Sequence, residues 1–351
     1  MRRAGRSLRV AGIVGLALAL SFGAAACGNE GGSGSGGKVT LRLGYFPNLT
    51  HAPAIIGVEK GLFRKELGAG VTLTTTTFNA GPDVVTAIFS NALDIAYIGP
   101  NPAINAWAQS KGAAIRIISG ATSGGAALVV KPSITSVSQL KGKKIASPQL
   151  GNTQDVALRA FLKDHGYKTD KTGGGDVKVV AQANSQTLET FKSGLIDGAW
   201  VPEPWATRLV LEGGGKVLID EKTLWPDGRF VTTHVIVRTA FLREHGDVVE
   251  NFLRGHVATV DYANENPEDA KTIVNGSLEK ITGKALKTEV IDEAWKNLIF
   301  TIDPVASSLR ASAKDAEAVG LLDRVDLEGI YDLKPLNAVL KALRRPDIVT
   351  D

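Results

Sequence analysis

Length, composition and charge place this chain among the globular proteins. It has 351 residues, of which 44% are hydrophobic and 22% are charged, and these values exclude a fibrous or wholly disordered protein. Lys and Arg number 40 against 36 Asp and Glu, but four of the arginines and none of the acids precede Cys27, which leaves 36 of each sign. Because the remaining charge is balanced, we expect no nucleic-acid partner. The single cysteine excludes an intramolecular disulfide and a Cys-rich metal centre.

The beginning of the chain has the pattern of a secretory signal peptide over residues 1–26. Four arginines precede the apolar run Val10–Phe22, and small residues follow up to Cys27. Cys27 is placed as in a bacterial lipobox, which it resembles, although Ala24 stands where that motif usually has Leu. We expect Cys27 to be lipidated, and residues 28–37, nearly all Gly and Ser, to form a flexible tether on the extracytoplasmic face of the cell membrane. A plain secreted protein with an incidental cysteine is the alternative.

From Lys38 onward, short β-rich runs alternate with amphipathic helical runs. The first strands are expected at Val39–Tyr45, Val71–Thr77, Asp94–Ile98 and Ile115–Ser119. The intervening helices are expected at Pro53–Lys60, from Gly81 to Ser90 with Pro82 in the first turn, and from Pro102. This alternation predicts an α/β fold with a mostly parallel sheet and helices on both of its faces.

The same order of elements recurs in the second half of the chain. Further strands are expected at Lys144–Ser147, Val177–Val180, Ala199–Val201 and Lys216–Asp220, and helices at Thr153–Asp164, Ser185–Lys192 and Pro204–Glu212. The segment Phe89–Pro102 aligns without gaps with Phe191–Pro204, 102 residues later, and shares its Phe, its Leu and both prolines. We therefore expect two similar lobes.

The lobes are expected to exchange the chain at two crossings, Val129–Lys131 and Thr232–His234. After His234 and one further strand, the chain is expected to be largely helical. Lobe I would then comprise residues 38–131 and 233–351, and lobe II residues 132–232.

Four polar loops follow the predicted strands. In open α/β sheets, ligands bind beyond the carboxyl ends of the strands, where helix N-termini present free N–H groups. These loops contain amides, hydroxyls, one histidine and aromatic residues, but neither Lys nor Arg, and neutral donors of this kind suit a small oxyanion. The candidate ligand-binding residues are Asn48, Thr50 and His51; Gly99, Pro100 and Asn101; Gln149, Gly151, Asn152 and Thr153; and Glu203 and Trp205, with His234 at a crossing.

Several of these residues have a purely structural alternative. Asn101, placed before Pro102, is a plausible N-cap, and Asn152 and Thr153 could likewise cap the next helix. His51 could hydrogen-bond the backbone, and His234 could be a satisfied core histidine.

The aromatic and charged residues near the loops also leave choices open. Tyr97 and Trp200 lie in apolar strands and are expected in the core, whereas Trp205 is expected to form a pocket wall and Arg208 to be a surface charge. Glu203 would repel an anion, so either it points to solvent or the ligand also carries a cationic or donor group.

A family resemblance rests on the order and spacing of several motifs. They are Leu41–Pro47 (LRLGYFP), Glu59–Phe63 (EKGLF), Phe78–Pro82 (FNAGP), Asp94–Gly99 (DIAYIG), Ser138–Ala146 (SQLKGKKIA) and Val201–Trp205 (VPEPW). Together they resemble the nitrate/sulfonate/taurine family of ABC-importer substrate-binding proteins, over nearly the whole chain after Lys38.

The resemblance implies a two-lobed periplasmic-binding-protein-like fold (type II) that closes by a hinge over a small anion. It also implies delivery to an ABC permease and ATPase, with no cofactor and no metal, and we expect a monomer. An organosulfonate, either an alkanesulfonate or a taurine-like molecule, ranks above nitrate, because the loops lack the basic residue expected of the nitrate-binding branch.

Other functions stay open at this point. The ligand could be nitrate, bicarbonate or a thiamine-pyrimidine precursor, and the protein could report to a sensor instead of a transporter. The fold is also similar to that of some enzymes. However, no catalytic motif occurs, and the five histidines show no metal-binding spacing. We therefore expect a binding protein and not an enzyme.

Overall fold

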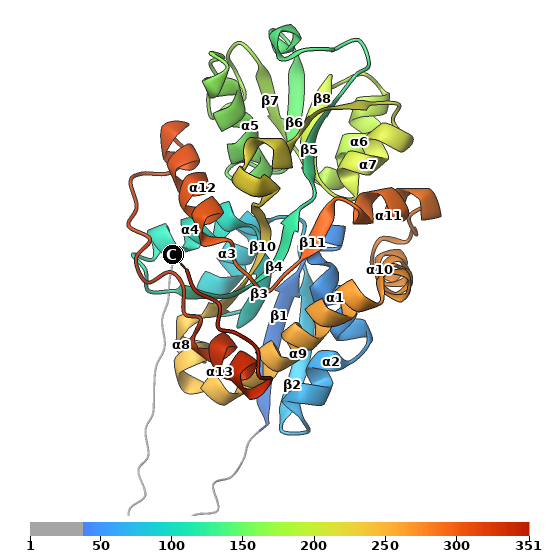
Figure 1. Ribbon diagram of the computed structural model, residues 1–351. Helices are drawn as coiled ribbons and strands as arrows, with labels where there is room; N and C mark the ends of the chain where they lie inside the picture. Colours follow the sequence, from blue (N-terminus) through green and yellow to red (C-terminus); the bar gives the residue numbers. More distant parts are fainter. Residues whose placement is uncertain (1–37, 351) are drawn as a thin grey trace, which may run out of the picture. The chain divides into compact units, whose positions relative to one another are not determined.

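Two mixed β-sheets, each flanked by helices, form the two lobes of the protein (Figure 1). The computed structural model describes residues 38–350. The predicted signal peptide, Cys27 and the tether lie outside the described residues. Among the described residues, no helix combines the length and the apolar character that crossing a membrane requires.

The first sheet has six strands in the order β11-β4-β10-β3-β1-β2. Strands β1, β2, β3 and β4 run in one direction, while β10 and β11 run in the other. Their bounds are β1 (Val39–Tyr45), β2 (Val71–Thr77), β3 (Ile95–Ile98), β4 (Ile115–Gly124), β10 (Val231–Arg238) and β11 (Leu298–Phe300).

The second sheet has five strands in the order β7-β6-β8-β5-β9. Strand β5 runs against the other four, just as β10 runs against β1–β4 in the first sheet. Their bounds are β5 (Ala126–Val130), β6 (Lys144–Ser147), β7 (Lys178–Ala181), β8 (Gly198–Pro202) and β9 (Lys216–Asp220). The order β2-β1-β3-β10-β4 thus recurs as β7-β6-β8-β5-β9, the repetition that the sequence predicted. The α/β fold class is confirmed, and the sheets are mixed because β10 and β11 run in reverse in the first sheet and β5 does so in the second.

The chain passes between the two sheets twice, and both crossings lie earlier in the chain than predicted. Val129 pairs with Ala199 inside the second sheet, so the first change is not at Val129–Lys131 but at Gly124–Gly125, where both residues have positive φ (80° and 74°). The return precedes Val231, since Thr232–His234 already lie within β10.

Helices cover both faces of each sheet. In the first lobe, those before β4 are the 3₁₀ turn η1 (Leu49–His51), α1 (Ala52–Glu59), α2 (Leu62–Leu67), α3 (Gly81–Phe89) and α4 (Pro100–Gln109). Those of the second lobe are η2 (Val137–Leu140), α5 (Thr153–Asp164), α6 (Asn184–Lys192), α7 (Trp205–Leu211), η3 (Glu221–Leu224) and η4 (Pro226–Gly228). Helix α4 begins at Pro100 after Gly99 as N-cap, so Asn101 lies in its first turn and is not the predicted cap.

The last third of the chain is largely helical, as predicted, and adds β11. Its helices are α8 (Thr239–Glu244), α9 (Gly246–Glu265), α10 (Pro267–Thr282), α11 (Thr288–Trp295), α12 (Ala306–Ala318) and α13 (Lys334–Ala342). Helix α9 packs on α1 and α2, while α11 contacts α7 and α12 contacts α5 of the second lobe.

The core of each lobe lies between its sheet and these helices. Phe63 of α2 stacks on Phe252 of α9 with ring centroids 4.7 Å apart. Tyr97 and Trp200 are fully buried, as the sequence indicated. The hydroxyl of Tyr97 donates to His256 Nδ1 (2.7 Å) and the indole N–H of Trp200 donates to Glu221 (2.6 Å), so both polar ends are satisfied.

Candidate functional site

Loops that follow strands of both sheets meet around one small cavity between the lobes, which we call the inner cavity. Its volume is about 20 Å³, room on the scale of a water molecule. All four predicted loops contribute to it. The lining residues are Phe46, Asn48, Thr50, His51, Asn79, Gly99, Asn152, Thr153, Gln154, Asn184, Pro202 and Thr232.

The loop after β1 brings a neutral histidine to the cavity. His51 Nδ1 accepts a hydrogen bond from the backbone N–H of Phe46 (3.2 Å), and the two rings stack 4.2 Å apart. Burial lowers the pKa of His51 to about 3, so the ring is uncharged at neutral pH. Because Nδ1 is the acceptor, the ring proton is on Nε2, and His51 is a neutral donor.

The loop after β6 brings an unpartnered hydroxyl. Thr153 is the first residue of α5, the residue is 6% exposed, and its Oγ1 has no hydrogen-bond partner. Asn152 occupies the N-cap position, but no side chain caps this helix, so the capping interpretation is wrong for both residues. The free N–H groups of the first turn of α5 and the positive end of its helix dipole both favour an anion at the start of this helix.

The two lobes approach each other closely at this point. A Cβ atom on Gly99, at the start of α4, would lie 2.3 Å from Thr153 Oγ1, which is closer than van der Waals contact allows. A side chain at position 99 would therefore keep α5 of the second lobe from packing against the first lobe, and glycine avoids this clash.

Two asparagines of the inner cavity were missed by the sequence analysis. Asn184 is 7% exposed, and its Oδ1 has no partner. Asn79 follows β2 and Asn184 follows β7, so the same rule about the carboxyl ends of strands would have found both.

Some predicted site residues do not line the inner cavity. The amide of Asn101 donates to the carbonyl of Ser312 on α12 (3.1 Å), and Gly151 donates its backbone N–H to Asp155 (2.9 Å). Gln149 reaches Asp83 at the rim (3.5 Å), and Pro100 is buried in the first turn of α4.

Glu203 faces away from the inner cavity. Its carboxylate accepts from the backbone N–H (3.1 Å) and the hydroxyl (2.9 Å) of Thr207, and from the amide of Asn297 (2.8 Å), which precedes β11 in the first lobe. Burial raises the pKa of Glu203 to about 7, although these hydrogen bonds act in the opposite direction. The expected conflict between Glu203 and an anion does not arise, because the carboxylate braces the two lobes elsewhere.

His234 also lies outside the inner cavity. Its Nε2–H donates to the carbonyl of Pro304 (2.8 Å), and burial lowers its pKa to about 4. His234 is therefore a buried, neutral histidine of β10, but it is only half satisfied, because its Nδ1 has no hydrogen-bond partner.

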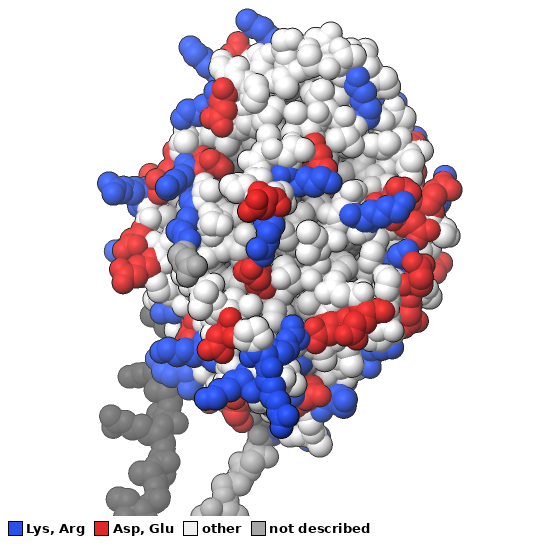
Figure 2. Space-filling view, viewed as in Figure 1, with Lys and Arg blue, Asp and Glu red and all other residues white. Residues whose placement is uncertain are grey.

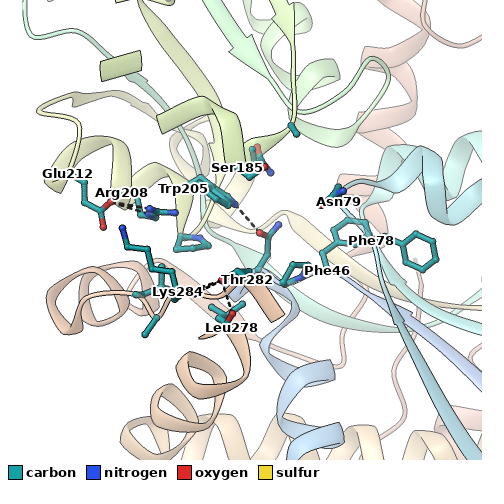
Figure 3. Close-up of a pocket in the computed structure, with 17 residues that line it drawn as sticks. Phe46, Phe78, Asn79, Ser185, Trp205, Arg208, Glu212, Leu278, Thr282 and Lys284 are labelled. Atoms are coloured by element: carbon teal, nitrogen blue, oxygen red, sulfur yellow. Dashed lines mark hydrogen bonds and ion pairs between the residues drawn. The ribbon is translucent and has the colours of Figure 1, made fainter. Parts of the chain in front are cut away.

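A larger pocket adjoins the inner cavity, and we call it the outer pocket (Figure 3). It has a volume of about 260 Å³ and shares Phe46, Asn48, Asn79 and Asn184 with the inner cavity. Its remaining lining residues are Pro47, Phe78, Ala183, Ser185, Pro204, Trp205, Arg208, Glu212, Leu278, Thr282, Lys284, Ala285 and Leu286.

Trp205 is a pocket wall, as predicted, and it also connects the lobes. Its indole N–H donates to Asn48 Oδ1 (3.0 Å), which ties α7 to the loop after β1. Arg208 lies over the Trp205 ring at 4.9 Å and pairs with Glu212 (3.1 Å), with a side chain only 16% exposed. The expectation that Arg208 is a surface charge is therefore wrong; the indole ring and Glu212 hold it against the pocket.

Charge on the surface is mixed. Figure 2 shows Lys and Arg interspersed with Asp and Glu on the face in view. This face does not carry the one-signed basic surface that binding to a phosphate backbone requires. Within residues 38–350, no group of His, Cys, Asp and Glu is arranged to hold a metal ion.

The two lobes and the cavity between them have the two-lobed periplasmic-binding-protein fold. A family model described as NMT1-like matches residues 34–276. The chain therefore belongs to the NMT1-like family.

Relatives and solved structures agree with this class. The chain is 30% identical over 217 residues to the taurine-binding periplasmic protein of Escherichia coli K12, an alignment that covers 62% of this chain and 64% of that protein. The alkanesulfonate-binding protein of Xanthomonas axonopodis pv. citri, solved bound to MOPS, superposes with a TM-score of 0.67 at 18% identity and covers 82% of this chain and 95% of its own. The periplasmic nitrate-binding protein of Synechocystis PCC 6803 gives 0.73 at 16% identity, covering 88% and 90%. At these identities the two structures support the fold alone.

Proposed function

We propose that this protein is the substrate-binding component of an ABC importer and that its ligand is a small organosulfonate. The observation that carries the proposal is the inner cavity, whose twelve lining residues include polar groups from both lobes but no Asp, Glu, Lys or Arg. Buried polar atoms normally have hydrogen-bond partners. The hydroxyl Thr153 Oγ1 has none and lines this cavity, so it is free to donate to an anion, whereas the unpartnered Asn184 Oδ1 can only accept from a donor group on the ligand.

The proposed binding mode uses neutral donors. The inner cavity has room for about one water, so we propose that the lobes stand slightly further apart around the ligand. The hydroxyl of Thr153 and the Nε2–H of His51 then donate to sulfonate oxygens, and the first turn of α5 adds its N–H groups and the helix dipole. An anion held in this way needs no counter-charge. Burial holds the pKa of His51 at about 3, which makes its ring a poor general base, and we expect binding without turnover.

Capture proceeds by closure of the lobes. We propose that the hinge runs through Gly124–Gly125 and the segment before Val231, and that ligand binding shifts an open–closed equilibrium. The Trp205–Asn48 hydrogen bond and the seating of Thr153 against Gly99 form only when the lobes meet. A permease and an ATPase would recognise the closed form.

For the location and the assembly of the protein, we propose what the sequence predicts. We propose that Cys27 carries a lipid anchor that holds a monomer on the extracytoplasmic face of the cell membrane. The relative named for taurine and the neighbour named for alkanesulfonates support the sulfonate class. Nitrate ranks lower, because the lining of the inner cavity includes no cationic residue.

The test is calorimetric titration of the purified protein with alkanesulfonates, taurine, nitrate, bicarbonate and a thiamine-pyrimidine precursor. We expect a sulfonate to bind and to be recovered unaltered, as judged by mass spectrometry. Binding of nitrate or bicarbonate alone would replace the ligand class, and conversion of a bound sulfonate would overturn the assignment as a binding protein.

A further inference from the structure

Asn184 lines both the inner cavity and the outer pocket, and its side-chain oxygen is a buried acceptor without a donor. It is the first residue of α6 and is only 7% exposed, and none of the described residues donates to its Oδ1. An amide oxygen can only accept a hydrogen bond, and leaving a buried acceptor unpaired costs free energy. A donor that satisfies Asn184 therefore has to come from outside the chain.

The sulfonate head of the proposed ligand cannot supply this donor. A sulfonate is ionised at neutral pH and presents only acceptor oxygens, which suit the hydroxyl of Thr153 and the Nε2–H of His51. Against Asn184 Oδ1, the same oxygens would meet another acceptor. The donor therefore belongs to the remainder of the ligand. Because the inner cavity measures only about 20 Å³ and Asn184 lines it, the donor group lies close to the head.

The acidic residues near the site leave this task to Asn184. The carboxylates of Asp155, Glu203 and Glu212 already accept hydrogen bonds or an ion pair from the protein. A neutral amide oxygen can accept from a hydroxyl group as well as from an ammonium group. The chemistry that the site requires is thus a hydrogen-bond donor, which either group provides.

We infer that Asn184 is a specificity-determining residue whose Oδ1 accepts a hydrogen bond from a hydroxyl or ammonium group that the ligand carries near its sulfonate. A ligand with a methyl group in that place leaves the acceptor unpaired, and a site built to bind a polar group discriminates against analogues that lack it. This inference rests on the proposed function and deepens it, since the proposal alone does not rank donor-bearing sulfonates above plain alkanesulfonates.

Three ligands of equal length test the inference on the wild-type protein. Propane-1-sulfonate, 2-hydroxyethanesulfonate and taurine differ only in ending with a methyl, a hydroxyl or an ammonium group. Calorimetric titration of the purified protein should give binding that is tighter by about tenfold or more for a donor-bearing ligand than for propane-1-sulfonate. Whichever of the two binds more tightly identifies the donor. Propane-1-sulfonate binding as tightly as both would overturn the inference.

Two variants assign the discrimination to Asn184. Asn184→Leu keeps a side chain of similar size without the acceptor, and should bring propane-1-sulfonate to within about twofold of the better donor-bearing ligand. Asn251→Leu in α9 is the matched control, because Asn251 lines neither space, and it should keep the wild-type ratio. An Asn184→Leu variant that weakens all three ligands by the same factor would contradict the assigned role.

The outcomes separate this inference from the proposed function. Thr153→Val should weaken all three sulfonates by a similar factor and leave their ratios unchanged, because its hydroxyl contacts the shared head. If the three sulfonates bind the wild type equally, this inference fails and the proposed function stands. If no sulfonate binds, the proposed function fails and this inference fails with it.

Discussion

Two loops of the second lobe begin at the same edge of its sheet, after the parallel strands β6 and β8, but their polar side chains differ in whether they have hydrogen-bond partners. The loop after β6 presents Thr153, whose buried hydroxyl has no partner, while the loop after β8 presents Glu203, whose carboxylate has three donors. The Thr153 hydroxyl is free to bind the proposed ligand, whereas the Glu203 carboxylate is already bonded within the protein. Position at a strand end therefore indicates where a site lies, but the partners of each side chain decide which residues belong to it.

The largest expected effect concerns the closest approach of the lobes. In Gly99→Val, the new side chain would occupy the place of Thr153 Oγ1 and hold the lobes apart. We expect sulfonate affinity to fall about 10³-fold, equivalent to about 4 kcal/mol, with an unchanged melting temperature without ligand. Gly70→Ala is the control, since a Cβ there meets nothing within 4 Å. Equal affinity in Gly99→Val and the control would contradict the closed geometry.

The next effect tests the structural character of Glu203. Its pKa in the folded protein is about 7, above the ordinary value of 4.5. The stability that its protonated form contributes is therefore present below about pH 4.5 and lost as the pH rises through 7. We expect the free energy of unfolding of Glu203→Gln, minus that of the wild type, to increase between these pH values by on the order of 3 kcal/mol.

Urea denaturation of both proteins at several pH values measures this difference. The buried histidines also contribute a pH dependence, because burial lowers the pKa values of His51 and His234, but their contribution cancels between the two proteins. A difference that stays constant with pH would show that Glu203 is not held in the buried environment described here.

A smaller effect distinguishes the inner cavity from its surroundings. Thr153→Val removes a hydroxyl that has no protein partner, so we expect 10- to 100-fold weaker sulfonate binding, about 1–3 kcal/mol, without loss of stability. Asn101→Ala should do the reverse and lower stability by about 1 kcal/mol, because it removes the bond to Ser312 while Asn101 does not line the cavity. Calorimetry measures the affinity of both variants and thermal melts measure their stability. A loss of stability in Thr153→Val with unchanged affinity, or a loss of affinity in Asn101→Ala with unchanged stability, would contradict this assignment.

The smallest effect concerns the bond between the lobes at the outer pocket. Trp205→Phe keeps an aromatic wall and removes the hydrogen bond to Asn48, so we expect a three- to tenfold loss of affinity, about 0.5–1.5 kcal/mol. Stopped-flow measurement should place the loss in the dissociation rate, because the bond exists only in the closed form. A slower association with unchanged dissociation would argue against that assignment.

Much of the fold followed from the alternation of strands and helices, and the meeting of the four loops followed from the shared direction of the strands. The crossings did not, because the apolar run Ala126–Val130 reads the same in either sheet and only its pairing with β8 decides. The direction of Glu203 could not be predicted, since it depends on Asn297, 94 residues away. Asn79 and Asn184 were within reach of the sequence, whereas the burial of Arg208 against Trp205 needed the packing of α7.

The central claim is that uncharged donors, not the nearby cations, hold the anion. A crystal structure of the protein with butanesulfonate tests this claim most directly. We expect the sulfonate oxygens within hydrogen-bond distance of Thr153 Oγ1 and His51 Nε2, with the alkyl chain beside Trp205. A sulfonate bound instead to Arg208 or Lys284, with the inner cavity unoccupied, would contradict it.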